Sequence, residues 1–304
     1  YDQGVEVDNV LVSLGATGAF YATAMSLLNE GDEVILFEPY YGYHVATLES
    51  IGCKIKYIRT TPPSYEIDFE YLKSQISEDT KAILICNPSN PSGKVYTREE
   101  LESLSDIINQ NDLFLFSDEM YEHFIYDGLE FVSALSMENL RNRTVVISGF
   151  SKIYSITGWR IGYAITQKEI IDAASAFNDL IYVCPPAPLQ NGILKGLNEL
   201  PKSYYQNVAI EHQKKRDKFI KTLNDAGLSA DYVKGAYYVL ADISKLEGAD
   251  DKEKVVNLLD KTGIAAVPAR AFYQDSEGIN LARFCFSKKE DELDQAIERL
   301  RNLQ

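Results

Sequence analysis

The chain has 304 residues, of which 45% are hydrophobic and 25% are charged. These values are typical of a globular protein of roughly two domains, at about 150 residues each, and they exclude a disordered chain, a collagen, a coiled coil and a small disulfide scaffold. With 30 basic and 45 acidic residues, the formal charge is −15, which disfavours nucleic acids and anionic membranes as partners.

The first half of the chain alternates short apolar runs with amphipathic stretches. The runs are rich in Val, Ile, Leu and Phe with little alternation, which predicts strands that are buried on both faces. The strands are expected at Val10–Leu14, Val34–Phe37, Ile55–Ile58, Ala82–Cys86, Leu113–Ser117, Val145–Ser148 and Ile161–Ile165. The helices are expected at Gly18–Asn29, Tyr43–Ile51, Phe69–Ile76 and Arg98–Asn109, the last with a capping box of Thr97 and Glu100. This alternation predicts a three-layer, doubly wound, mostly parallel α/β sheet.

The pattern changes after the proline-rich stretch 185–188. A long helix is expected near 204–226, followed by a strand at 235–241, a helix near 252–261, a strand near 281–286 and a final helix. In that final helix Leu293, Ile297 and Leu300 share one face. We therefore predict a large α/β domain over residues 1–200 and a smaller α+β domain over residues 201–304.

Neither a membrane span nor a signal peptide is evident in the sequence. The four cysteines form no CxxC pair, and the three histidines show no metal-ligand spacing. We expect reduced structural thiols, a cytoplasmic location and no metal site.

Ligands of doubly wound sheets bind at the carboxyl ends of the strands, and the residues there carry chemistry. Ala16 and Thr17 lie between a strand and a helix, where backbone N–H groups can bind a phosphate, although a plain tight turn would explain them too. Tyr41 follows the next strand and either packs or stacks on a planar ring. Asn90 lies between two Asn-Pro steps, in a turn that would hold its amide in a fixed position.

Two further strand ends bring ionisable groups to the same edge. Asp118 ends an apolar strand, where an unpaired carboxylate is costly, and Tyr121 follows three residues later. Lys152 follows small residues after the next strand, and a desolvated lysine there is a candidate nucleophile rather than an ordinary surface lysine. Arg160 is placed to bring a guanidinium back to this pocket. One ligand that uses this whole set of groups is pyridoxal 5′-phosphate.

The motifs around these residues resemble those of the fold-type I, class I/II aminotransferases of the aspartate aminotransferase superfamily. The resemblance is carried by Asn87–Gly93 (NPSNPSG), Asp118–Tyr121 (DEMY) and Gly149–Gly162 (GFSKIYSITGWRIG), which occur in the family's order. Val267–Tyr273 (VPARAFY) and Arg283–Lys289 (RFCFSKK) are similar to the glutamine transaminase K, kynurenine and methionine aminotransferase branch. The resemblance implies transfer of an amino group from an L-amino acid, with methionine, glutamine or an aromatic amino acid favoured, to a 2-oxo acid.

It also implies the catalytic roles. Lys152 would hold pyridoxal 5′-phosphate as a Schiff base and then move a proton during turnover. Asp118 would keep the pyridine nitrogen protonated, which makes the ring an electron sink. Asn90 and Tyr121 would hydrogen-bond the 3′-oxygen, and Asn90 would also contact the substrate.

The remaining implied roles concern binding. Tyr41 would stack on the ring, and Ala16, Thr17 and Arg160 would bind the phosphate. Arg283 would hold the substrate carboxylate in a bidentate fork, although a surface arginine near a strand is the simpler alternative for that residue taken alone.

The chain departs from the family pattern at two places. Gly149 stands where many relatives carry a serine that contacts the phosphate, with Ser148 and Ser151 on either side. Family members also carry a long segment ahead of the Gly15–Gly18 turn, which supplies part of the small domain and of the dimer. We expect that segment to be missing ahead of Tyr1, and we expect the protein to act as a homodimer.

Two alternatives remain open at this point. A pyridoxal-phosphate-dependent C–S lyase would use the same cofactor-binding residues. A non-catalytic or truncated cofactor-binding domain is a second alternative, against which the presence of Lys152, Asp118 and Arg283 argues.

Overall fold

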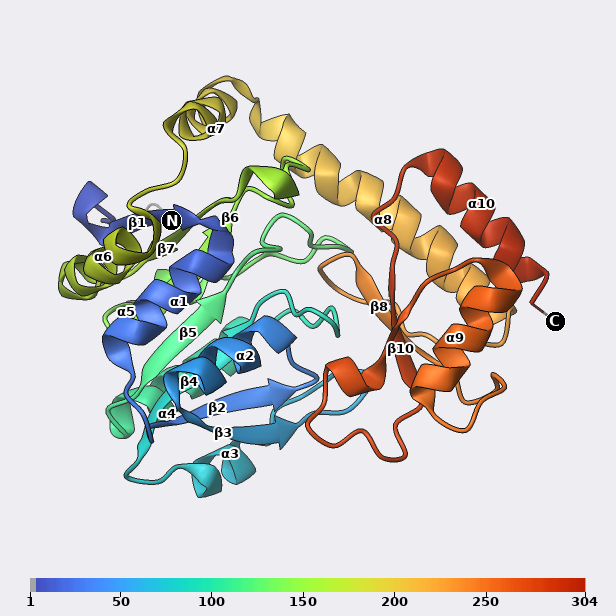
Figure 1. Ribbon diagram of the computed structural model, residues 1–304, viewed down its shortest axis with the longest axis horizontal. Helices are drawn as coiled ribbons and strands as arrows, with labels where there is room; N and C mark the ends of the chain where they lie inside the picture. The colour runs from blue at the N-terminus through green and yellow to red at the C-terminus, as the bar shows by residue number, and fades with distance from the viewer. Residues whose placement is uncertain (1–3, 304) are drawn as a thin grey trace.

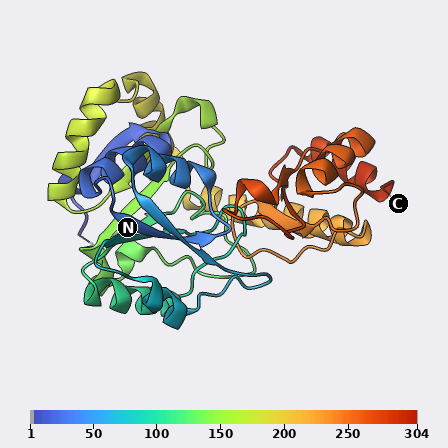
Figure 2. The same cartoon turned by 60° about the horizontal axis from the view of Figure 1, so that its bottom comes forward.

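The computed structural model describes residues 4–303. A large α/β part carries the first half of the chain, and a smaller part built around β8, β10, α9 and α10 lies beside it (Figures 1 and 2). The 24-residue helix α8 (Lys202–Asp225) runs from the large part to the small part (Figure 1). The predicted division near residue 200 falls just before this helix and stays a prediction.

The centre of the large part is a seven-stranded sheet within residues 4–303, with the order β1-β7-β6-β5-β4-β2-β3. Of its strand pairs, β1–β7 and β6–β7 are antiparallel and the others are parallel, so β7 alone runs against the rest. This confirms the predicted mostly parallel sheet. The strands are β1 (Val10–Leu14), β2 (Glu33–Glu38), β3 (Lys54–Arg59), β4 (Thr80–Cys86), β5 (Phe114–Asp118), β6 (Thr144–Gly149) and β7 (Ile161–Ile165).

Helices cover both faces of the sheet. Successive residues of a strand point to opposite faces, so each strand contributes side chains to two cores. Val34 and Leu36 of β2 pack into a core with α1, α2 and α6, whereas Ile35 between them packs into a core with α3, α4 and α5. Both faces are therefore buried, which explains why these strands are apolar without alternation. The helices are α1 (Gly15–Leu27), α2 (Gly42–Ile51), α3 (Phe69–Gln75), α4 (Arg98–Gln110), α5 (Glu138–Arg141) and α6 (Lys168–Tyr182).

The observed helices differ from the prediction in the start of α1 and in the presence of two helices that were not predicted. α1 begins at Gly15 rather than Gly18, because Gly15 adopts φ +70° and turns the chain into a helix directly after β1. Ala16 and Thr17 therefore lie in the first turn of the helix, not in a loop before it. The helices α6 and α7 (Ala187–Glu199) were not predicted, although Pro188 lies in the first turn of α7, where proline is favoured.

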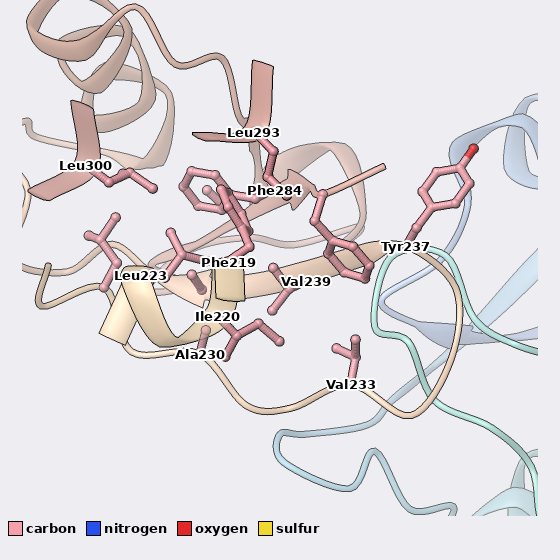
Figure 3. Packing of buried hydrophobic residues seen from close by; sticks show 14 of the residues in the cluster. Phe219, Ile220, Leu223, Ala230, Val233, Tyr237, Val239, Phe284, Leu293 and Leu300 are labelled. Atoms are coloured by element: carbon pink, nitrogen blue, oxygen red, sulfur yellow. The ribbon is translucent and has the colours of Figure 1, made fainter. Parts of the chain in front are cut away.

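The small part packs around an apolar core that Tyr121, Phe124 and Tyr126 of the large part also join. Its three-stranded antiparallel sheet has the order β8-β10-β9, formed by β8 (Tyr238–Asp242), β9 (Val267–Pro268) and β10 (Leu281–Cys285). Phe219 and Leu223 of α8 and Leu293 and Leu300 of α10 (Glu290–Arg301) pack around Phe284 (Figure 3). The predicted face of the final helix is thus the buried one. α9 (Asp251–Thr262) completes this part.

The strand β8 starts at Tyr238, three residues later than predicted. Ala236 just before it adopts φ +56°, and this backbone conformation is incompatible with a regular strand. Among residues 4–303, none of the helices combines the length and apolar character required to cross a membrane.

Candidate active site

The carboxyl ends of the parallel strands surround a cavity of about 340 Å³. Eight of the nine predicted site residues line it, although they come from five separate chain segments. The eight are Ala16, Thr17, Tyr41, Asn90, Asp118, Tyr121, Lys152 and Arg160. The structure therefore brings together in space the residues that the motifs placed at successive strand ends.

One end of the cavity is cationic and rich in backbone donors. The first turn of α1 leaves its N–H groups without partners inside the helix, and Ala16 and Thr17 lie in that turn. The Arg160 guanidinium lies against Gly15, where an added Cβ would be 2.4 Å from its Nη2 atom. A Cβ on Gly162 would be 2.3 Å from the backbone N of Ala16. Two glycines thus let a guanidinium and a helix N-terminus approach each other closely, which favours an anion.

At the other end, Asp118 is the last residue of β5 and is 93% buried. Its Oδ2 lies 2.9 Å from Nε2 of His44, and its Oδ1 accepts the Met120 N–H at 3.1 Å. His44 is itself buried and packs edge-on against Tyr41 and Phe20. These partners offset the desolvation of a buried carboxylate and fix its orientation.

His44 is a site residue that the sequence analysis missed. It lies three residues after Tyr41 on α2, so both side chains project from the same side of the helix toward the cavity. That spacing is the signal that could have identified it.

Lys152 lies in the turn that follows β6. Burial, together with the nearby Arg160 and Arg283 guanidinium groups, lowers the pKa of its amine, and Cys285 and Asp118 oppose this shift only in part. A lowered pKa increases the fraction of unprotonated amine near neutral pH, which is the form that attacks a carbonyl or accepts a proton.

Two aromatic residues and one amide complete the wall. Tyr41 is the N-cap residue of α2, and burial raises the pKa of its phenol, so the phenol stays protonated. Burial likewise raises the pKa of Tyr121. Asn90 is held by its loop, which Asn87 anchors by donating to the Val132 carbonyl and accepting the Tyr96 N–H.

Arg283 is the one predicted site residue that is not in the cavity wall. It lies on β10 and reaches the site through Asn90, donating from Nη1 to Oδ1 at 2.9 Å. Its Nε is buried and has no hydrogen-bond partner within the described residues. A buried guanidinium N–H without a partner is costly, so this atom is available to a ligand oxygen.

The position of Gly149 has a steric reason. A Cβ there would lie 2.9 Å from Cα of Gly162 on the neighbouring strand. Ser148 points away from the cavity and donates to the Glu119 carbonyl, whereas Ser151 and Thr157 line the cavity next to Arg160. These two hydroxyls are the candidates to replace the serine of the family pattern. The rest of the cavity wall, also unpredicted, is formed by Phe20, Tyr43, Cys86 and Met120.

This donor set fits pyridoxal 5′-phosphate, the cofactor implied by the sequence resemblance. A phosphate matches the cationic end with its close-packed glycines, and a protonated pyridine nitrogen matches the buried carboxylate of Asp118. The Lys152 amine, whose pKa is lowered, lies in the same cavity and can react with the aldehyde carbon of the cofactor. No group of three or more metal-ligating side chains occurs in the described part of the chain.

Known proteins resemble the chain over nearly its whole length. The family model "Aminotransferase class I and II" matches residues 3–300. The methionine aminotransferase of Escherichia coli is 32% identical over 295 residues, which cover 97% of this chain and 76% of the relative. A probable kynurenine–oxoglutarate transaminase of Saccharomyces cerevisiae is also 32% identical, over 333 residues that cover 100% of this chain and 75% of the relative.

Solved structures give the same result. An Escherichia coli protein with a methionine aminotransferase function superposes with a TM-score of 0.93 at 32% identity, covering 98% of this chain and 78% of that protein. A tetra mutant of the Thermus thermophilus aspartate aminotransferase has a TM-score of 0.90 at 30% identity, with 99% and 81% coverage.

Proposed function

This chain belongs to the class I and II aminotransferase family, and we propose that the nine residues identified above carry out its reaction. The protein is a pyridoxal-phosphate-dependent transaminase, which moves an amino group from an amino acid to a 2-oxo acid. The observation that best supports the residue roles is that eight of the nine line one cavity at the carboxyl edge of the sheet.

Four residues bind the phosphate and one face of the ring in this proposal. Arg160 and the first-turn N–H groups of Ala16 and Thr17 bind the phosphate, since a guanidinium and a helix N-terminus both favour an anion. Tyr41 lies against the ring. When bound, the cofactor supplies an electron sink for the electron pair that is released at the substrate Cα.

Asp118 keeps the pyridine nitrogen protonated. Its carboxylate is held in one orientation because His44 and the Met120 N–H donate to its two oxygens. Tyr121 remains a protonated phenol and, together with the Asn90 amide, donates to the 3′-oxygen. These residues tune the ring electrostatically and do not themselves react.

Lys152 is the reacting residue. Its Nζ would hold the cofactor covalently in the resting protein and, once free, would take the proton from the substrate Cα. Its lowered pKa supports both tasks, since each requires the unprotonated amine. Neither Arg160 nor Arg283 can substitute, as a guanidinium stays protonated.

Arg283 and Asn90 bind the substrate carboxylate. The hydrogen bond between them holds the guanidinium next to the cavity wall, and the unpartnered Nε is available to the carboxylate. We infer that the side chain of the preferred donor is not acidic, and that methionine, glutamine and aromatic amino acids are the donors. An acidic side chain would require a cation to bind it, and the lysine and arginine of the described cavity wall, Lys152 and Arg160, already have other partners in this proposal. The relatives named for methionine and kynurenine support the same choice.

We further propose that the protein acts as a cytoplasmic homodimer with domains over residues 1–200 and 201–304. Large apolar side chains that are exposed on and after α6, such as Leu180 at 83% and Val183 at 67%, support a protein partner on this side. Light scattering tests the assembly. A monomeric mass at all concentrations would contradict a dimer.

The role of Lys152 is tested by Lys152→Ala. We expect the variant to bind the cofactor without a covalent link, to lose the visible absorbance of the lysine-bound form and to lose nearly all turnover. Normal transamination by this variant would refute the assignment.

A further inference from the structure

Tyr238, the first residue of β8, connects two parts of the site and has no role in the mechanism above. The Tyr121 hydroxyl donates to the Tyr238 hydroxyl at 3.3 Å, and the two rings meet edge-on with centroids 5.9 Å apart. The Arg283 guanidinium lies over the same Tyr238 ring, with its Cζ 4.2 Å from the ring centroid. One side chain therefore contacts both the proposed carboxylate-binding arginine and a phenol of the cavity wall.

The backbone before Tyr238 is fixed to two loops of the active site. The Gly235 N–H donates to the Gly93 carbonyl, and the Ala236 N–H donates to the Phe124 carbonyl, both at 2.9 Å. These two partners lie in the loops that carry Asn90 and Tyr121. Tyr237, the neighbour of Tyr238, belongs to the apolar core of the small part (Figure 3), and its ring meets that of Tyr121 edge-on with centroids 5.1 Å apart. These bonds fix the position of Tyr238 relative to the loops that carry Asn90 and Tyr121.

The Arg283 guanidinium is enclosed from several sides. Besides the Tyr238 ring, the Phe272 ring centroid lies 5.0 Å from its Cζ, and Nη1 donates to Asn90 at 2.9 Å. Two rings and one amide leave the guanidinium few alternative orientations. Stacking on an aromatic face stabilises the cation while leaving its in-plane N–H groups free for a carboxylate.

We infer that Tyr238 is a positioning residue for the reaction, acting through Arg283 with its ring and through Tyr121 with its hydroxyl. This inference rests on the roles proposed above for those two residues. The ring orients the guanidinium for the substrate carboxylate. When the cofactor is bound and Tyr121 donates its proton to the 3′-oxygen, the Tyr238 hydroxyl rotates and donates to the Tyr121 oxygen instead, which fixes the phenol. Binding of the carboxylate and alignment of the phenol then depend on the same side chain.

Two kinds of variant distinguish the role of the Tyr238 ring from the role of its hydroxyl. Tyr238→Phe keeps the ring and removes the hydroxyl, whereas Tyr238→Leu and the bulkier Tyr238→Met remove the ring. Tyr57→Phe is the matched control, because Tyr57 is a half-buried tyrosine on β3 whose ring packs on Tyr40, outside the cavity wall. All are made in the full, cofactor-loaded chain.

The first measurement is the dissociation constant of 3-phenylpropanoate, a carboxylate without an amino group, which cannot react. We expect Tyr238→Leu and Tyr238→Met to raise it roughly 3- to 20-fold, the range of a partly desolvated cation–π contact. Tyr238→Phe and Tyr57→Phe should stay within about twofold of the parent. Equal constants in all variants, or an equal rise in the control, would overturn the role of the ring.

The second measurement is the split between kcat and KM. Tyr238→Phe should lower kcat roughly 3- to 10-fold with little change in KM, as expected for one neutral hydrogen bond. In a Tyr121→Phe background the same change should have no further effect, because the two hydroxyls act as one unit. Additive losses in kcat would overturn the role of the hydroxyl. A parent protein without transaminase activity would instead refute the residue roles, and the carboxylate measurement would still test the ring.

Discussion

His44→Phe is the change that most directly probes how Asp118 is held. His44 donates from Nε2 to Asp118 Oδ2 at 2.9 Å, and its ring packs edge-on against Phe20 and Tyr41 at centroid distances of 5.1 and 5.2 Å. Phenylalanine retains a ring for that packing and removes the N–H. The variant therefore isolates one hydrogen bond to a buried carboxylate.

The size of the effect follows from the remaining partners of Asp118. A hydrogen bond to a charged group contributes about 1.5–3 kcal/mol, equivalent to roughly 10- to 150-fold in rate if it is lost entirely in the transition state. Asp118 keeps the Met120 N–H at 3.1 Å, so its orientation is preserved in part. We expect kcat to fall about 10-fold, near the lower end of that range.

The assay is the steady-state kcat at saturating donor and acceptor, with cofactor content determined separately from its visible absorbance. His123→Phe is the control, because His123 lies outside the cavity wall and packs against Tyr205. We expect this control to keep the parental kcat. A fully loaded His44→Phe protein with kcat within twofold of the parent would refute the reasoning.

Three further predictions concern charge, backbone approach and substrate binding. Burial raises the pKa of Glu119 from its ordinary 4.5 to about 7, so the folded state binds more protons than the unfolded state between these values. The parent should therefore lose stability as the pH rises from 4.5 to 7, by at most about 3 kcal/mol. In urea titrations at pH 5 and pH 8, Glu119→Gln should lack this loss, and an equal loss in both proteins would contradict the argument. Gly162→Ala places a Cβ against the backbone of α1, whereas Gly158→Ala meets no atom within 4 Å. After dialysis we expect the first variant to lose cofactor and the second to keep it, and equal retention would be the contrary result. Arg283→Ala should raise KM roughly 10- to 100-fold for every amino donor, as expected from losing a charge-assisted contact, and a rise confined to one donor would indicate a different carboxylate site.

The sheet was predictable because its strands are buried on both faces. A run such as Val34–Phe37, repeated between amphipathic helices, favours strands in the middle of a three-layer fold. The capping box of Thr97 and Glu100 likewise fixed the start of α4, because it satisfies N–H groups that otherwise lack partners. The site residues followed from the rule that ligands bind where parallel strands end.

Other features depend on contacts that no local pattern encodes. The start of α1 depends on the positive φ of Gly15, and the late start of β8 depends on bonds from Gly235 and Ala236 to loops that lie more than 100 residues earlier. The spacing from Tyr41 places His44 at the cavity, but its hydrogen bond to Asp118, 74 residues away at the end of β5, is not encoded locally. The link from Tyr238 to Tyr121 and Arg283 is likewise tertiary.

The most direct test of the central claim is product analysis with the cofactor-loaded protein. Methionine, glutamine and phenylalanine are each supplied with a 2-oxo acid acceptor, and both products are quantified. We expect one new 2-oxo acid and one new amino acid in a one-to-one ratio, with no turnover beyond one equivalent when the acceptor is omitted. Sustained release of pyruvate and ammonia from cystathionine without any acceptor, together with no amino transfer, would contradict the account.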